Sequence, residues 1–188
     1  MANWPLVLAR AGDNDLDLAV ILRLVADAAN WLRTKNTDQW ARPWPDDAGR
    51  EDRIRAALRQ GKSWICWDDV TPAATITTDP DEDPYWPQER RTEPSIYVHR
   101  LIVSRRYAGT GLGAALLDWA GRTGRLEHGA RWIRLSAWTT NHGLHEYYRR
   151  QGFSLFAFYP NDSYPSGAFF QKPTTEIPAA SAALFRQA

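Results

Sequence analysis

The chain has 188 residues, of which 44% are hydrophobic and 24% charged, values typical of one folded domain large enough to bury a core. Its formal net charge of +1 argues against nucleic-acid and anionic-membrane partners, and no apolar run approaches the ~20 residues that span a bilayer. The single cysteine, Cys66, excludes an internal disulfide and a cysteine-based metal site, and the N-terminus lacks the basic segment of a signal peptide. We therefore expect a cytoplasmic protein with no metal, no nucleic acid and no membrane partner.

The first half of the chain predicts one strand, two helices and a hairpin. The first helix follows the N-cap residues Asp13, Asn14 and Asp15 and carries an apolar stripe at helical spacing. The stripe consists of Leu18, Ile21, Leu22, Val25, Ala29 and Leu32. In chain order, we expect a strand over 6–11, this helix, a proline-rich connection over 34–47, a second helix over 48–60, and strands over 63–69 and 73–79.

The second half predicts a long loop followed by alternating strands and helices. Four prolines and dense charge over 79–94 predict a loop, and a loop of this length is usually functional or mobile. The strand over 95–103 is apolar on both faces apart from His99 and Arg100, which is typical of a central strand. The later elements are a helix after the glycines of 109–113, a strand over 130–138, a helix over 142–152, and an antiparallel pair over 153–159 and 167–172.

This order predicts an α/β fold in which about four helices pack on the faces of a mixed sheet of about seven strands. The composition shows no linker and no internal repeat, so we expect one domain over 1–172. The remaining segment, 173–188, is poorly specified and is expected to be an arm or disordered.

Three glycines at alternating positions, Gly109, Gly111 and Gly113, stand where the strand over 95–103 turns into a helix. Such a turn leaves backbone N–H groups unpaired, and a phosphate approaches them closely where no Cβ intervenes, so the spacing predicts a pyrophosphate-binding turn. A Walker-type loop fails because two alanines follow Gly113 in place of Lys-Ser/Thr. A dinucleotide-binding turn fits loosely but lacks the acidic residue expected ~20 residues later. A glycine-rich turn without a ligand is the remaining alternative.

The segment "VSRRYAGTGLGAALL" over 103–117 resembles the signature of the GNAT acetyltransferase superfamily, Gln/Arg-x-x-Gly-x-Gly/Ala after a central strand. Arg106, Gly109 and Gly111 match this signature. Ala108 stands where many relatives have arginine, so one phosphate contact of the family is missing while the backbone turn is kept.

A second resemblance to the same family lies downstream, in "NHGLHEYYRRQGF" over 141–153. Asn141 and Tyr148 stand at the asparagine and tyrosine of the family motif, Leu144 replaces its alanine, and Gly152 with Phe153 closes it. The resemblance covers essentially the whole chain, although residues 1–94 match only in predicted topology.

The resemblance implies a mostly antiparallel sheet with splayed central strands and acetyl-CoA as co-substrate. The glycine turn would hold the pyrophosphate, and the backbone of the strand ending at Val103 would pair with the pantetheine amides and polarise the thioester carbonyl. Asn141 would bind the pantetheine arm, and Tyr148 would protonate the leaving thiolate as general acid. The residues implied to contact acetyl-CoA are Leu101, Ile102, Val103, Arg106, Ala108, Gly109, Thr110, Gly111, Leu112, Gly113, Ala114, Asn141 and Tyr148.

The general base is assigned to His99, which titrates in the useful range and is expected on the same strand face as Tyr97 and Leu101. The alternative is a hydrogen-bonded core histidine. His142 and His145, on the helix over 142–152, are expected to be orienting or surface groups.

Trp31, Trp40 and Trp86 are candidates for acceptor binding, and the segment "DPDEDP" over 79–84 places four acidic residues in the long loop. Aromatic faces and acidic side chains together favour a small cationic amine with an apolar or ring-bearing body. A solvated loop and core tryptophans are the alternative.

The sequence therefore predicts an acetyl-CoA-dependent N-acetyltransferase that acts on a primary amine of a small molecule as a monomer or homodimer. Tyr148 favours an enzyme, because a non-catalytic acyl-CoA-binding module needs no proton donor beside the sulfur. That module and a protein-lysine acetyltransferase are the alternatives, and the missing acidic residue disfavours a nucleotide-binding dehydrogenase domain.

Overall fold

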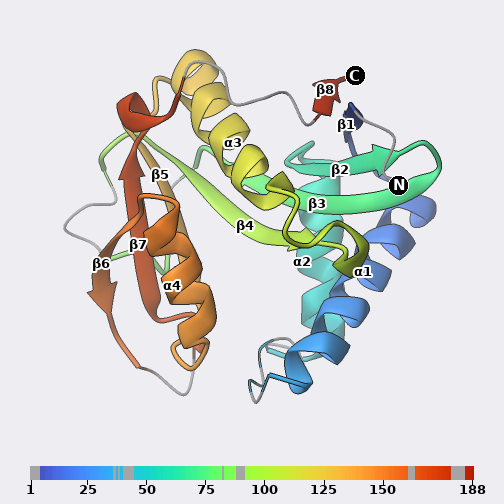
Figure 1. Cartoon of the computed structure of the whole chain (residues 1–188), viewed down its shortest axis with the longest axis horizontal. Coiled ribbons are helices and arrows are strands. Elements are labelled where there is room, and N and C mark those ends of the chain that lie inside the picture. Colours follow the sequence, from blue (N-terminus) through green and yellow to red (C-terminus); the bar gives the residue numbers. More distant parts are fainter. Residues whose placement is uncertain are drawn as a thin grey trace. The chain divides into compact units, whose positions relative to one another are not determined.

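The structure is a computed structural model of the chain (Figure 1). It describes residues 5–35, 37, 39, 45–81, 83–87, 92–160, 164–178 and 185–188. Its elements, in order, are β1 (Leu6–Arg10), α1 (Asp15–Arg33), α2 (Asp47–Arg59), β2 (Ser63–Asp68), β3 (Thr71–Asp79), β4 (Ser95–Val103), the 3-10 turn η2 (Arg105–Tyr107), α3 (Leu112–His128), β5 (Trp132–Ala137), α4 (His142–Arg150), β6 (Ser154–Phe158), β7 (Ala168–Pro173), the 3-10 turn η3 (Thr174–Glu176) and β8 (Phe185–Gln187). The strands of the described residues form one sheet in the order β6-β7-β5-β4-β3-β2-β1-β8, which confirms the predicted mixed α/β class.

The chain divides into two compact units. The first comprises residues 1–77, 100–115 and 182–188, and the second comprises residues 78–99 and 116–181. Three of the boundaries fall inside β3, β4 and α3, so each of these elements contributes to both units.

The first unit is built around α1, α2 and the strands β1, β2 and β3. Asn14 caps α1 by accepting from the Asp17 N–H, which confirms the predicted start of this helix. The helices bury one face each in a shared apolar cluster, and Figure 1 shows them side by side. The cluster contains Ala11, Leu18, Ile21, Leu24, Val25, Ile54, Leu58, Ile65 and Ile102. Leu24 was missed by the predicted stripe, which included the less buried Leu22 and Ala29 instead.

Residues near the C-terminus add an eighth strand to the seven expected. β8 pairs in parallel with β1, with Phe185 opposite Leu6 and Gln187 opposite Leu8, and the Ala188 N–H donates to the Leu8 carbonyl. A short edge strand of three residues carries too little pattern to be recognised in sequence.

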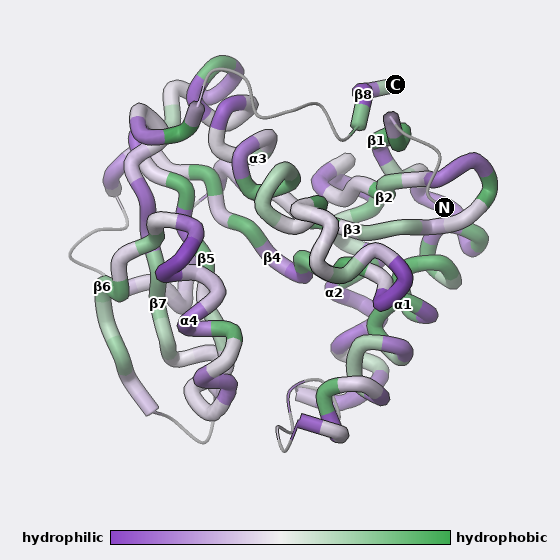
Figure 2. Tube along the Cα trace, in the orientation of Figure 1, coloured by the Kyte–Doolittle hydropathy of each residue, from purple (hydrophilic) through white to green (hydrophobic). Residues whose placement is uncertain are grey.

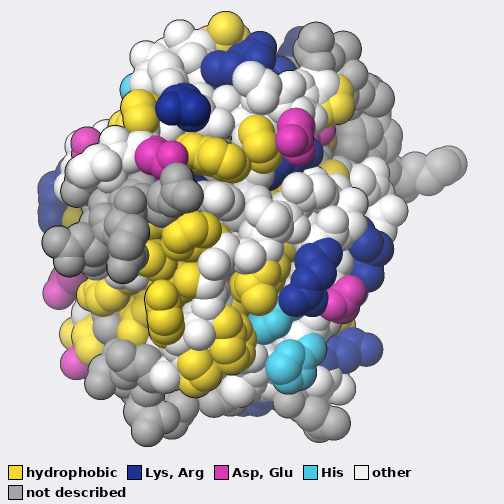
Figure 3. Space-filling model, turned by 90° about the vertical axis from the view of Figure 1, so that its left-hand side faces the viewer, with side chains coloured by type: hydrophobic (Ala, Val, Ile, Leu, Met, Phe, Trp, Pro, Cys, Tyr) yellow, Lys and Arg dark blue, Asp and Glu magenta, His cyan; other side chains and the backbone are white. Residues whose placement is uncertain are grey.

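The second unit is built around β5 and β7, which pair antiparallel along their whole length, with β6 added on the outer side of β7. α3 approaches β4 closely at Gly124, where an added Cβ would lie 2.6 Å from the Cβ of Ile96. On the outer strand and just after it, Leu155, Phe158 and Tyr159 are exposed, and Figure 3 shows hydrophobic side chains gathered on this face. In the described part of the chain, no helix is long and apolar enough to cross a membrane.

β4 changes character along its length. Its first residues pair in parallel with β5, from Ser95 opposite Trp132 to Val98 opposite Leu135, and are buried. Beyond Val98, Ile102 is buried and the other residues of the strand are half-buried. Arg100 has a φ of 50°, in the left-handed region that residues with a Cβ rarely adopt. In Figure 2, β4 is mostly hydrophobic, with a hydrophilic stretch in its second half.

Candidate active site

The glycine turn follows β4 and η2 in the first unit. Gly109 and Gly111 have φ values of 77° and 85°, a conformation that explains why glycine occupies both positions. A Cβ placed on Gly109 would meet no described atom within 4 Å, and the backbone from Ala108 to Gly111 is exposed. The turn therefore presents bare backbone to solvent.

The N-terminus of α3 is not built like those of the other helices. Asn14, Asp46 and Asn141 cap α1, α2 and α4, and each side chain accepts a backbone N–H of the first turn. α3 begins directly after Gly111, whose carbonyl accepts from the Ala115 N–H at 3.0 Å, and its first turn contains no acidic residue. Helix geometry then directs the N–H groups of residues 112–114 out of the helix end, where they and the helix dipole favour an anion.

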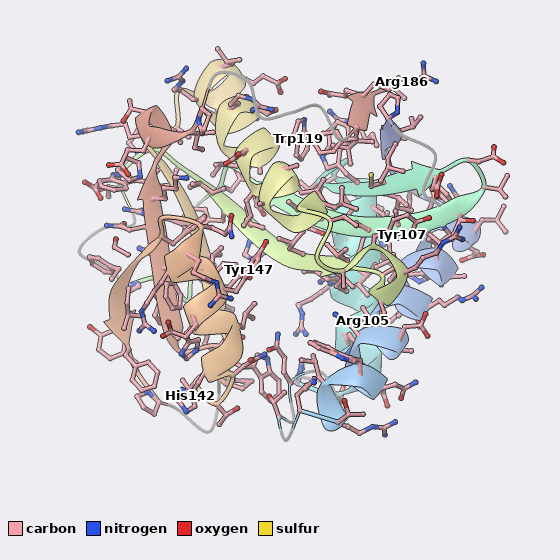
Figure 4. The ribbon with its side chains drawn as sticks, in the orientation of Figure 1. Arg105, Tyr107, Trp119, His142, Tyr147 and Arg186 are labelled. Atoms are coloured by element: carbon pink, nitrogen blue, oxygen red, sulfur yellow. The ribbon has the colours of Figure 1, made fainter. Side chains whose placement is uncertain are left out.

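A buried hydrogen bond anchors the turn to the sheet of the first unit. The Tyr107 hydroxyl donates to Asp68 Oδ2 at 2.6 Å, and both side chains are buried. Burial and this bond to Asp68 raise the pKa of Tyr107 to about 12, so the phenol remains a donor at neutral pH. The Thr110 hydroxyl donates to the Tyr107 carbonyl at 2.7 Å. Figure 4 labels Tyr107 and Arg105 on this turn.

The strand residues assigned to the pantetheine arm lie just before this turn. Ile102 is buried in the core of the first unit, while Leu101 and Val103 are partly exposed. The Ser104 N–H donates to the Ala73 carbonyl of β3 at 2.8 Å and fixes the end of the strand.

His99, the predicted base, is half-buried in the second unit and is followed directly by Arg100. The positive φ of Arg100 interrupts the alternation of side chains along β4. A shared face for His99 and Leu101 can therefore no longer be inferred from their spacing. The base role of His99 stays a prediction.

The second family motif forms α4 in the second unit. The Oδ1 atom of Asn141 accepts from the Leu144 N–H at 3.0 Å, so this asparagine is the helix N-cap. Tyr148 is 7% exposed and its ring contacts those of Tyr147, Phe153 and Phe170. Burial, with a smaller effect of Tyr147, raises the pKa of the Tyr148 phenol, which therefore keeps its proton through the physiological range.

Three further side chains on α4, those of His142, His145 and Tyr147, differ in how far they are buried. His145 is buried, its Nε2 lies 2.8 Å from the Trp138 carbonyl oxygen, and burial lowers its pKa. His142 is exposed at the start of the helix, as labelled in Figure 4. Tyr147 is half-buried, and burial followed by the charge of Asp118 raises the pKa of its phenol.

The residues predicted to bind the acceptor differ in their burial and in the side chains around them. Trp31, on α1, is half-buried, and the Arg105 guanidinium carbon lies 3.8 Å from its ring centroid. Trp86 is fully buried in an aromatic cluster with Tyr97 and Phe169 in the second unit. Trp40 lies outside the described residues.

The acidic segment over 79–84 is only partly exposed, and two of its carboxylates accept hydrogen bonds from nearby backbone N–H groups. Asp83 is buried and accepts from the Tyr85 N–H at 2.9 Å, while Asp79 accepts from the Asp81 N–H at 2.9 Å. Glu82 lies outside the described residues. Among the described residues, no three His, Cys, Asp or Glu side chains gather as a group that could hold a metal ion.

Sequence reasoning missed a buried ionic network in the second unit. Arg134, in the middle of β5, is completely buried and lies 2.6 Å from Glu93 Oε2. It also donates to Tyr97 and Gln171, each at 3.3 Å, and lies 5.0 Å from the Trp86 ring. The sequence does contain a signal for this network. Arg134 stands in a largely apolar strand, and an arginine buried in such a strand requires a buried partner.

A glycine turn that opens a helix after a central strand of a mixed sheet is an anion-binding arrangement found among α/β proteins. The profile of the Acetyltransferase (GNAT) family matches residues 25–153. A protein of Bacillus subtilis (strain 168), described as the uncharacterized N-acetyltransferase YesJ, is 33% identical over 143 residues, which are 74% of this chain and 77% of that protein. The chain therefore belongs to the GNAT family and is an acetyltransferase, in a family that uses acetyl-CoA.

Solved structures show the same fold at lower identity. A GNAT-family acetyltransferase from Listeria monocytogenes 4b F2365 gives a TM-score of 0.67 at 20% identity, with 92% of this chain and 98% of that chain covered. The PaiA N-acetyltransferase from Thermoplasma acidophilum, in complex with coenzyme A, gives a TM-score of 0.64 at 14% identity, with 88% and 97% covered.

The bond between Tyr107 and Asp68 should contribute measurably to stability. Tyr107→Phe removes the donor to a buried carboxylate, and we expect the free energy of unfolding at pH 7 to fall by about 1–3 kcal/mol in urea titrations. Tyr159→Phe, at an exposed tyrosine, is the control and should change little. Since folding raises the pKa of Tyr107 from 10.0 to about 12, the parent should lose this advantage as pH rises through that interval. Equal stability of both variants would show that the bond is not a significant anchor.

Proposed function

We propose that the protein transfers the acetyl group of acetyl-CoA to a primary amine of a small molecule, as a monomer or homodimer in the cytoplasm. The observation that carries the proposal is the N-terminus of α3, which follows two left-handed glycines and has no acidic residue in its first turn. In a chain of the GNAT family, such a turn is suited to the pyrophosphate of CoA.

The residues present fit this co-substrate. The exposed turn from Ala108 to Gly111 and the N–H groups of residues 112–114 would hold the pyrophosphate, and the exposed Arg106 guanidinium supplies positive charge beside them. The backbone of Leu101–Val103 and the side chain of Asn141 would hold the pantetheine arm. When bound, acetyl-CoA supplies a thioester whose carbonyl carbon an amine can attack.

Side chains of the protein would then accept one proton from the amine and donate another to the sulfur. His99 would take a proton from the incoming ammonium, so that the amine nitrogen can form the new C–N bond while the C–S bond breaks. A backbone N–H of β4 would polarise the carbonyl, and Tyr148 would donate its hydroxyl proton to the sulfur. The second proton that the nitrogen loses as the amide forms would pass to solvent, and solvent would restore the Tyr148 hydroxyl. Burial raises the pKa of the Tyr148 phenol, which keeps its proton at neutral pH and is at the same time a weaker acid than an exposed tyrosine. Leu101–Val103 lie in the first unit, and His99, Asn141 and Tyr148 lie in the second.

For the acceptor, we propose contacts with Trp31 and Trp40 and a supporting role for the buried Trp86. Arg105 covers one face of the Trp31 ring, so an acceptor would use the opposite face or the ring edge. Trp86 would act from within its aromatic cluster, as support for groups in contact with the acceptor.

Gly109→Ala tests the phosphate-binding turn. The added Cβ meets no described protein atom within 4 Å, so its steric effect would fall on a ligand, and the affinity for CoA should drop on the order of tenfold, equivalent to about 1.4 kcal/mol. Gly129→Ala is a matched control, because Gly129 also has positive φ and an open Cβ position and lies after α3. Both variants should suffer similar backbone strain, about 1–2 kcal/mol. Calorimetry that finds parental CoA affinity in Gly109→Ala would remove the turn from the binding site.

Tyr148→Phe tests the general acid. We expect kcat to fall by roughly 10²–10⁴-fold with little change in CoA affinity. Tyr147→Phe is the control, because it removes a neighbouring phenol from the same helix turn. The raised pKa of Tyr148 also predicts that the parental rate does not decline as pH approaches ~10, the ordinary pKa of tyrosine. A larger loss in Tyr147→Phe than in Tyr148→Phe would transfer the role to Tyr147.

His99→Ala tests the base through the pH profile of kcat/KM. The parent should lose activity on the acidic side of its profile, where a protonated His99 cannot accept a proton, and the variant should be slow without that acidic limb. His128→Ala, at an exposed histidine at the end of α3, should keep the parental profile. An acidic limb that persists unchanged in His99→Ala would assign it to another group.

A further inference from the structure

Two tyrosines from separate loops stack on each other in the second unit. Tyr85 belongs to the loop after β3 and Tyr164 to the loop between β6 and β7. Their ring centroids lie 4.2 Å apart, with an angle of 7° between the ring planes. Tyr164 also packs against the buried aromatic cluster of Trp86, Tyr97 and Phe169. Tyr85 is 47% exposed, so a large part of this residue stays open to solvent although Tyr164 covers one face of its ring.

The exposed ring of Tyr85 stands on a turn that is held in place. Asp83 is buried, its Oδ1 accepts from the Tyr85 N–H at 2.9 Å, and its carbonyl accepts from the Trp86 N–H at 3.0 Å. On the other side of the stack, the Tyr164 hydroxyl lies 3.1 Å from Ser136 Oγ on β5. An aromatic side chain that is exposed and already ordered loses little conformational entropy when a ligand contacts it.

The stack lies beside the point where the pairing of β4 with β5 ends. The last pair is Val98 opposite Leu135. His99 and Ser136 are therefore the next residues along these two parallel strands. Ser136 is the residue whose hydroxyl contacts Tyr164, and His99 is the proposed general base. The stack is thus bonded to the strand position across from the proposed base.

His99 and the tyrosine stack belong to the same face of this part of the sheet. Side chains alternate along a strand, so His99 is on the face of Tyr97, which belongs to the aromatic cluster that supports the stack. Tyr148 is on the opposite face, because its ring contacts Phe170, which directly follows Phe169 of the cluster along β7. An acceptor held at the stack would therefore lie on the side of the proposed base, across the sheet from the proposed proton donor.

We propose that Tyr85 and Tyr164 form an acceptor-binding surface, on which an aromatic ring of the substrate amine stacks against the exposed side of Tyr85. The proposal rests on the proposed acetyl transfer and narrows its acceptor to primary amines that carry an aromatic ring. Aromatic rings attract one another in offset stacked or edge-to-face arrangements beyond the effect of the area that they bury. A ring of the acceptor would extend the stack that the two tyrosines already form.

Tyr85 takes the contact with the acceptor that the sequence assigned to its neighbour Trp86. Trp86 is fully buried, and its ring contacts those of Tyr97 and Phe169 at centroid distances of 5.8 and 5.3 Å. A ligand could reach Trp86 only by displacing these contacts, whereas Tyr85 is accessible as it stands. Trp86 would then anchor the turn, and Tyr85 would make the contact.

A binding experiment tests the surface without turnover. Phenethylamine and tryptamine are each titrated into the CoA-saturated protein, while the ring proton–carbon signals of Tyr85 are followed by NMR. The control ligand is the cyclohexyl counterpart of phenethylamine, which keeps the amine arm and the ring size but has no π electrons. We expect the two aromatic amines to shift the Tyr85 signals upfield and saturably through their ring currents, and the cyclohexyl amine to cause no such shift. Unmoved Tyr85 signals with both aromatic amines would overturn the proposal.

A turnover experiment assigns the contact to Tyr85. In the parent, kcat/KM for phenethylamine should exceed that for its cyclohexyl counterpart by roughly two- to tenfold, the range that one aromatic contact supplies. Tyr85→Leu should erase this preference by raising KM for phenethylamine, whereas Tyr85→Phe keeps the ring and should retain it. Tyr159→Leu, at another exposed tyrosine of the second unit, is the matched control and should behave as the parent does. A preference that persists in Tyr85→Leu, or that Tyr159→Leu removes equally, would overturn the assignment.

The two experiments separate failure of this surface from failure of the proposed function. Acetylation of phenethylamine and its cyclohexyl counterpart with equal kcat/KM would overturn the aromatic surface and leave acetyl transfer intact. Shifts of the Tyr85 signals without acetylation of any amine would support the surface and overturn the acetyl transfer to small amines. If CoA fails to bind, the proposed function fails, and the same titration of the CoA-free protein, read at Tyr85, still decides the surface.

Discussion

The start of α3 is the constraint on which the candidate site depends. A helix leaves its first N–H groups without partners, and α1, α2 and α4 each satisfy some of them with a side-chain cap. At α3 the chain instead enters through glycines with positive φ and leaves the backbone exposed. This arrangement needs support from elsewhere, and the buried hydrogen bond from Tyr107 to Asp68 supplies it by tying the turn to β2. The proposed binding of acetyl-CoA depends on this open helix end and on the turn that holds it.

Much of the fold could be predicted because its elements follow simple periodicities. The order of strands and helices, the N-cap at Asn14 and the central position of β4 all agree with the sequence-based expectation. The errors have local physical causes. Leu24 is buried because the apolar face of α1 is wider than a single stripe, and β8 is too short to leave a recognisable pattern. The positive φ of Arg100 has no sequence signal, since residues with a Cβ rarely adopt it.

The candidate site was predictable as a set of positions but not as a set of interactions. The motif that contains Asn141 and Tyr148 marks α4 correctly, yet it does not reveal that Asn141 caps the helix or that Tyr148 is enclosed by aromatic rings. The tryptophans show the same limit. Spacing indicates that Trp31 is on a helix, whereas the stacking of Arg105 over its ring depends on residues far apart in sequence. Pairings of this kind arise only when the backbone has brought distant segments together.

Charge is where sequence and structure lead to different expectations about the acceptor. The acidic segment over 79–84 favours a cationic molecule, but in the structure Asp83 is buried and its carboxylate accepts a backbone N–H. A carboxylate that is buried and already accepts a hydrogen bond within the protein attracts a cationic ligand less than an exposed one does. The number of acidic residues in this segment therefore overstates how strongly it can select a cationic acceptor.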